Sequence, residues 1–202
     1  MIPVTPQPEP NGFEIRVRTP GRAFLRRVLR PTGEQFRNAN YWNRCLPKLR
    51  EAYAAVCAYS SVWIATGGSV DHFWPKSLRP DLAYEWENYR LALEIVNNNK
   101  GESTDILDPF AIQPGWFALD FSNFFVKPND GLPEEVEVGV LRTIEILKLN
   151  KEDPFLKLRF LVVKEYAEGH FSLDFLRRRY PFIASELERQ DLAKSIKGRR
   201  FS

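Results

Sequence analysis

The chain has 202 residues, 44% of them hydrophobic and 27% charged, and a formal net charge of +3. These values are typical of a globular protein, and no apolar run approaches the roughly 18 to 20 residues that a membrane span needs. The first residues, MIPVTPQPEPNGF, have neither the basic start nor the apolar stretch of a secretory signal. We therefore expect a cytoplasmic protein, in which Cys45 and Cys57 are reduced thiols.

Basic residues gather near both ends of the sequence, in RVRTPGRAFLRRVLR at the start and in RRR and KSIKGRR near the end. Such clusters either follow a phosphate backbone or form solvated helix faces, and the sequence alone favours neither.

The first half of the chain predicts an arm followed by helix and strand. Four prolines make residues 1–12 an irregular arm. Apolar residues at intervals of three and four predict an amphipathic helix over Tyr41–Val56. The β-prone runs Ser69–Phe73 and Tyr89–Leu93 predict two short strands, and EIVNNNKG after them predicts the start of a helix.

The second half predicts short strands or packed loops at 102–131 and then helices at 132–150, 153–168 and 172–179, with a last one in SELERQDLAKSIK. The expected fold is α+β, mostly helical, with a small ββα core. We expect an N-terminal arm and helical segment (1–40), the core (41–105) and a mainly helical C-terminal region (106–202), packed as a single compact unit.

Residues 57–101 contain CAYS, VDHFWPKS, WENYRLAL and EIVNNNKG, in that order. This arrangement resembles the HNH (ββα-metal) endonuclease family, with Asp71 and His72 as the Asp-His pair, Asn88 as the middle asparagine and Asn97 as the third position. Lys100 and Gly101 complete the match. The flanking sequence is similar to bacterial HNH proteins linked to antiphage defence.

The resemblance implies hydrolysis of phosphodiester bonds in DNA, leaving a 5′-phosphate, with RNA as an alternative substrate. His72 is the expected general base, because a neutral imidazole accepts a proton from water. Asp71 and the side-chain oxygen of Asn97 are the expected ligands of one Mg²⁺ or Mn²⁺, a hard cation that prefers oxygen. Asn88 belongs to the catalytic set by holding the His72 region in place.

Lys76 and Lys100 are candidate contacts to the substrate phosphate. Adjacent strand residues point to opposite faces, so Asp71 and His72 serve one site only if the strand ends or bends there. The resemblance to defence nucleases also suggests an ATPase partner.

The sequence departs from the family at its structural zinc, which many members bind through two Cys-x-x-Cys pairs. Only Cys57 is kept; the other three positions are Ser60, Leu93 and Val96. Because a structural zinc needs four ligands, we expect none here and predict that Leu93 and Val96 replace it by apolar packing.

Several alternatives stay open. Because Asn97 begins a run that continues with Asn98 and Asn99, a slip of one residue along the run is an alternative, although the Lys-Gly spacing favours Asn97. Loss of the zinc is also compatible with a catalytically silent module that binds nucleic acid or protein, or with a helical protein that matches by chance.

The second histidine, His170, is expected in a turn or at a helix cap. Among the tryptophans that could stack on bases, Trp63, Trp74 and Trp86, core packing is expected for Trp86, and Trp74 is the best candidate for stacking.

Overall fold

The computed structural model describes residues 1–198 and has the expected α+β fold, mostly helical, with two small antiparallel sheets. The chain forms two compact units. One, here called the hairpin unit, consists of Thr5–Ala58 and Ile64–Thr104. The other, the C-terminal unit, consists of Met1–Val4, Tyr59–Trp63 and the chain from Asp105 on. As predicted, residues 1–10 contain no regular helix or strand.

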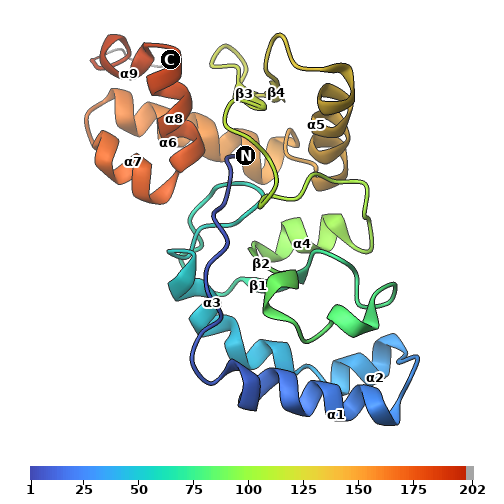
Figure 1. Ribbon diagram of the computed structural model, residues 1–202. Coiled ribbons are helices and arrows are strands. Elements are labelled where there is room, and N and C mark those ends of the chain that lie inside the picture. Colours follow the sequence, from blue (N-terminus) through green and yellow to red (C-terminus); the bar gives the residue numbers. More distant parts are fainter. Residues whose placement is uncertain (199–202) are drawn as a thin grey trace. The chain divides into compact units, whose positions relative to one another are not determined.

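The hairpin unit begins with a series of short helices (Figure 1). In chain order these are a π-helical stretch Glu14–Arg18, α1 (Thr19–Arg27), α2 (Gly33–Asn38), a 3₁₀ helix Tyr41–Cys45 and α3 (Leu46–Ala52). Thr32 caps α2 through a capping box with Gln35, which satisfies backbone donors at the start of the helix.

The helix predicted over Tyr41–Val56 is shorter than expected. It starts as a 3₁₀ helix, becomes α-helical at Leu46 and ends at Ala52. Ala54 and Ala55 follow in the left-handed region, with φ of 50° and 54°, and a helix cannot continue through such residues. The spacing of apolar residues predicted the buried face of the helix but did not indicate that the helix ends at Ala52.

Strand β1 (Ser69–His72) pairs antiparallel with β2 (Tyr89–Ala92), so that Asp71 lies opposite Arg90 and His72 opposite Tyr89. Helix α4 (Glu94–Lys100) follows β2 after the single residue Leu93. The predicted order of strand, loop, strand and helix is therefore confirmed, with both strands ending one residue early. Gly101, with φ of 54°, ends α4 in a conformation that side chains rarely adopt.

The C-terminal unit contains a small sheet and five helices among its described residues: β3 (Phe117–Leu119), β4 (Val126–Pro128), α5 (Glu134–Leu147), α6 (Lys157–Ala167), α7 (Leu173–Arg179), α8 (Pro181–Arg189) and α9 (Leu192–Ser195). The three helices predicted at 132–150, 153–168 and 172–179 are confirmed. The region from 153 begins as a π-helical stretch, Glu152–Leu156, before α6. Ser172 caps α7 by accepting a hydrogen bond from the Phe175 amide, as its residue type favours.

In the hairpin unit, α1 lies directly on the ring of Tyr84. A Cβ added at Gly21 would lie 2.1 Å from Cγ of Tyr84, well inside van der Waals contact. The Tyr84 hydroxyl donates to the carbonyl of Ala39, so the ring cannot move without breaking a buried hydrogen bond. Glycine at position 21 therefore sets how closely α1 approaches the loop between β1 and β2.

We predict that Gly21→Ala destabilises the protein by about 1 to 3 kcal/mol, because overpacking outweighs the better helix propensity of alanine. The matched control is Gly33→Ala in α2, where the added Cβ meets only Arg37 Nη1 at 3.7 Å. That change should be neutral or raise stability by less than about 1 kcal/mol. Urea unfolding followed by tryptophan fluorescence measures both, and equal effects of the two variants would contradict the close approach.

Candidate active site

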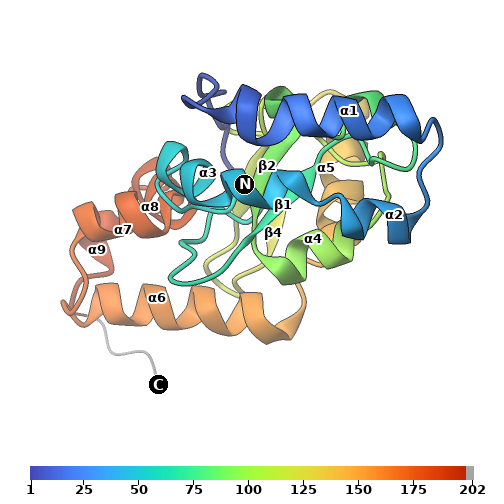
Figure 2. The same ribbon diagram turned by 90° about the horizontal axis from the view of Figure 1, so that it is seen from below.

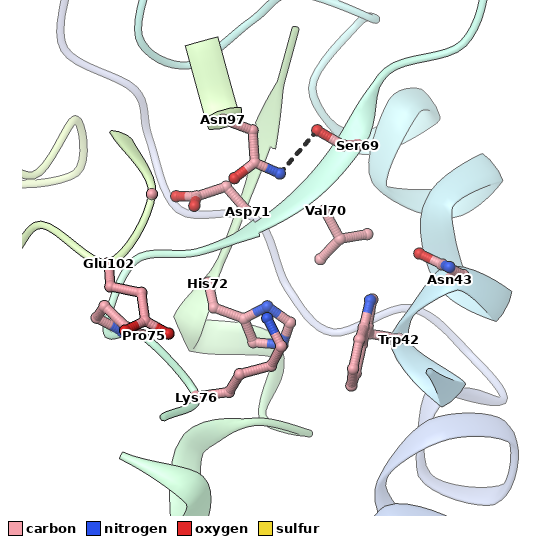
Figure 3. A pocket seen from close by; sticks show the side chains of 11 residues that line it. Trp42, Asn43, Ser69, Val70, Asp71, His72, Pro75, Lys76, Asn97 and Glu102 are labelled. Atoms are coloured by element: carbon pink, nitrogen blue, oxygen red, sulfur yellow. Dashed lines mark hydrogen bonds between the residues drawn. The ribbon is translucent and has the colours of Figure 1, made fainter. Parts of the chain in front are cut away.

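A pocket of about 270 Å³ lies at the end of β1 in the hairpin unit (Figure 3). Four of the six predicted site residues line it: Asp71, His72, Lys76 and Asn97. The other two, Asn88 and Lys100, do not line the pocket and instead support residues that do. Strand β1 ends at His72, and Figure 3 shows the Asp71 and His72 side chains leaving its ribbon in different directions while both line the pocket.

His72 is buried, with 6% of the residue exposed, and the tautomer of its imidazole follows from one hydrogen bond. Nε2 lies 2.9 Å from the carbonyl oxygen of Ala83, which can only accept, so Nε2 carries the proton. Nδ1 then has the lone pair, and no hydrogen bond to it exists within the described residues. The ring is held edge-on between Trp42 and Tyr89, at centroid distances of 4.9 and 5.2 Å.

Burial, together with the positive charges of Lys76 and Lys100, lowers the pKa of His72 to about 3, although the hydrogen bond to the Ala83 carbonyl opposes the shift. His72 is consequently neutral near pH 7 and can accept a proton through Nδ1. An anion entering the pocket would raise this pKa, because negative charge stabilises the imidazolium.

The Asp71 carboxylate forms a buried ion pair with Lys100. Oδ1 lies 3.0 Å from Nζ, and the two side chains are 2% and 0% exposed. Nζ also donates to the backbone carbonyl of His72 at 2.8 Å. A carboxylate offers about four acceptor positions, so the Lys100 bond does not by itself exhaust its capacity to bind a cation.

This geometry corrects the expectation that Lys100 contacts substrate. Its ammonium is fully buried and directed at Asp71 and at the backbone of His72, so a phosphate cannot reach it. Lys100 is a positioning residue that fastens the last turn of α4 to the end of β1. Lys76 remains the candidate phosphate contact, because it lines the pocket, with Nζ 5.5 Å from the centre of the Trp42 ring.

Asn97 presents an oxygen to the pocket because its amide nitrogen is used elsewhere. Nδ2 donates to Ser69 Oγ at 3.0 Å, and in Figure 3 the amide oxygen lies on the side of Asp71. Asn97 lines the pocket, whereas Asn98 is exposed and Asn99 does not line it. The position of α4 therefore agrees with the register inferred from the Lys-Gly spacing.

Asn88 fastens the two ends of the loop that follows β1. Its Oδ1 accepts from the Trp74 amide at 2.8 Å, and its Nδ2 donates to the carbonyls of Trp74 at 3.0 Å and Leu82 at 3.1 Å. The side chain is buried and lies beside Ala83, whose carbonyl orients His72. Asn88 thus holds the His72 region in place, the role that the resemblance implies for it.

Trp42, Ser69 and Glu102 also line or support the pocket, and sequence reasoning did not single them out. Glu102 follows the turn at Gly101, which brings its carboxylate to the pocket beside Pro75 (Figure 3). Burial lowers the pKa of Lys76, while Asp71 and Glu102 oppose that shift, so the pocket contains charges of both signs. The position of Glu102 directly after the Lys-Gly pair was the only feature of the sequence that could have indicated its place in the pocket.

The donor set fits a hard divalent cation. A carboxylate and an amide oxygen from two elements face a pocket with room for water and a phosphate oxygen. The one group of three His, Cys, Asp or Glu side chains close enough to share a metal among residues 1–198 lies elsewhere, at Glu165, Glu168 and His170 on the surface of the C-terminal unit. His170 lies in the turn after α6, as predicted, with Nδ1 2.9 Å from Glu165.

Apolar residues fill the positions where the family resemblance would put zinc ligands in α4 and before it. Val96 is fully buried, and the Leu93 amide donates to Sγ of the buried Cys57 at 3.4 Å. Trp86 is 3% exposed and belongs to the core, as predicted, whereas Trp74 is 44% exposed and remains available for stacking.

No known protein-family model matches this chain, and no curated protein matches it either. Within the described part of the chain, no helix combines the length and apolar composition needed to cross a bilayer. The site must therefore be interpreted from its own geometry and from the motif.

We predict that Lys100→Met destabilises the protein by about 3 to 5 kcal/mol, because it leaves the buried Asp71 carboxylate without this cation. Adding Asp71→Asn should recover part of that loss, since the charge that needs the lysine is removed. Lys48→Met is the matched control, because Lys48 pairs with Glu51 on the surface and should cost less than about 1 kcal/mol. Chemical denaturation of the wild type, Lys100→Met, Asp71→Asn, the double variant and Lys48→Met measures this. A double variant whose loss of stability equals the sum of the losses in the two single variants would argue against the ion pair.

Proposed function

We propose that the protein is a metal-dependent endonuclease of the HNH type that hydrolyses phosphodiester bonds in DNA. The observation that supports it best is the pocket itself, in which a neutral His72 of defined tautomer lies with the oxygen donors of Asp71 and Asn97. These residues come from an antiparallel ββα arrangement, the one that the motif predicts.

Each residue has a role that follows from its contacts. His72 Nδ1 accepts a proton from water as the water oxygen bonds to phosphorus and the bond from phosphorus to the 3′ oxygen of deoxyribose breaks; the leaving 3′ oxygen takes a proton from solvent. Lys76 lies where it can neutralise a nonbridging phosphate oxygen. Asp71 and Asn97 would hold Mg²⁺ or Mn²⁺, which supplies positive charge to stabilise the phosphate in the transition state.

The remaining expectations rest on the resemblance alone. They are a 5′-phosphate product, a place in bacterial antiphage defence in the cytoplasm, and an ATPase partner that controls cutting. RNA is the alternative substrate, because a site of this kind contacts phosphate geometry and not base identity.

The test is cleavage of supercoiled plasmid by purified protein with Mg²⁺, Mn²⁺ or chelator. His72→Ala should lower the rate at least about 100-fold, because the water loses its base. His170→Ala, at the exposed second histidine, is the matched control and should cut like the wild type. Cutting that survives in chelator, or equally in both histidine variants, would contradict the proposal.

The metal role has its own test in the asparagine run. Asn97→Ala should weaken binding of Mn²⁺, measured by electron paramagnetic resonance without any nucleic acid, by about 10-fold or more, because an oxygen donor is lost. The neighbouring exposed Asn98→Ala should leave Mn²⁺ binding unchanged. If no variant cuts and the wild type binds DNA without cutting, the silent nucleic-acid-binding module becomes the better description.

A further inference from the structure

The N-terminal helices of the hairpin unit concentrate positive charge far beyond the rest of the chain. Residues 15–50 contain nine arginines and one lysine but a single acidic residue, Glu34, whereas the whole chain has a net charge of only +3. The remainder of the protein is therefore acidic overall. A segment with this much positive charge attracts partners of high negative charge.

Some of these arginines are used within the fold. Arg18 pairs with Glu9, Glu14 and Glu85, and Arg50 donates to loop carbonyls, including that of Ile64 at 2.9 Å. Others are exposed, and their side chains make no hydrogen bond or ion pair within residues 1–198. We call this set the arginine surface: Arg16, Arg26, Arg27, Arg30 and Arg37.

We infer that the arginine surface binds the phosphate backbone of duplex DNA and holds it beside the His72 pocket. The identity of the ligand rests on the proposed nuclease function. Guanidinium groups that lack an internal carboxylate can each release counterions from a phosphate, which is the main source of sequence-independent affinity.

The aromatic side chains of the same segment argue for a duplex over a single strand. Phe24, Phe36 and Trp42 are at most 8% exposed, and Tyr41 is covered by the guanidinium of Arg44, 4.6 Å from its ring centre. Single strands are bound by stacking bases on exposed rings, and this surface offers none. We therefore expect the arginines to contact the phosphate backbone of a duplex.

A chain of packed rings connects the arginine surface to the pocket. Phe24 of α1 contacts Phe36 of α2 at 6.0 Å between centroids, Phe36 contacts Trp42 at 6.2 Å, and Trp42 contacts His72 at 4.9 Å. Figure 2 shows α1 and α2 as neighbours at one edge of the hairpin unit. The helices are thus fixed relative to the catalytic histidine, so DNA held on them has a defined position relative to it.

A protein helix is the alternative occupant of part of this region. Leu25, Leu29 and Pro80 line an apolar groove together with Arg22, Arg26 and Asp81, and its two arginines would suit an acidic amphipathic helix of another protein. Arg16, Arg27, Arg30 and Arg37 do not line that groove. Because the exposed arginines extend beyond the groove, the surface fits a polyanion better than a single helix.

The test measures binding of a fluorescent 20-base-pair DNA duplex by anisotropy, in chelator so that no cleavage occurs, over a range of salt. The fourfold variant Arg26→Gln, Arg27→Gln, Arg30→Gln, Arg37→Gln should bind at least about 10-fold more weakly, and its salt slope should fall by about 0.9 for each phosphate that the protein no longer neutralises. The control variant Arg142→Gln, Lys164→Gln, Arg177→Gln, Arg178→Gln removes the same charge from the C-terminal unit and should bind within about threefold of the wild type.

The outcomes separate this inference from the proposed function. Arginine-dependent duplex binding by a protein that cuts nothing in any metal supports the surface and contradicts the nuclease. His72-dependent cutting with duplex binding unchanged in the fourfold arginine variant overturns the surface and leaves the groove to a protein partner. Tighter binding of the wild type to the single strand of the same length also overturns it.

Discussion

The pocket depends on the buried contact of Lys100 with Asp71 and with the backbone of His72. An ammonium that is fully withdrawn from water is costly, and it is tolerated only when a carboxylate and further acceptors replace its hydration. Here those acceptors, Asp71 Oδ1 and the carbonyl oxygen of His72, lie at the end of β1. The position of Lys100, the last residue of α4, is therefore fixed relative to that strand. Asn97 lies one helical turn earlier and is brought to Ser69 by the same constraint. The arrangement of oxygen donors is thus a consequence of one ion pair.

The orientation of His72 depends on a second set of contacts, which begins at Asn88. By bonding to Trp74 and Leu82, Asn88 fixes the loop that contains Ala83. The Ala83 carbonyl accepts from both His72 Nε2 and the Tyr89 hydroxyl, each at 2.9 Å, and so uses both of its lone pairs. An imidazole held in this way cannot turn over to offer the other nitrogen. Asn88 therefore influences the orientation of His72 without lining the pocket.

Local pattern predicted those parts of the site that lie within a few residues of one another. The two strands, to within one residue at their ends, and the helix after Leu93 follow from β-prone composition and apolar spacing, which are short-range properties. The choice of Asn97 over Asn98 comes from the Lys-Gly spacing of the family that the motif resembles. Glu102 and Trp42 were not foreseen because only the folded chain brings them to β1. Lys100 was misassigned for the related reason that a lysine in a motif shows its charge but not its burial. The left-handed alanines after α3 left no trace in the apolar spacing.

The resemblance to zinc-containing HNH proteins raises the question of what connects the strand region to α4 in this chain. A zinc ion would join the two by four strong bonds, but leucine and valine at two of the positions offer no ligand atom. In their place, Val96 is fully buried, the Leu93 amide bonds to Cys57, and the Ala58 amide bonds to the carbonyl of Leu91 at 2.8 Å. Such contacts are individually weak and work only when all of them form together. The buried ion pair of Lys100 and Asp71 adds a charged connection between α4 and β1, so the geometry of the candidate site and the stability of the scaffold depend on the same residue.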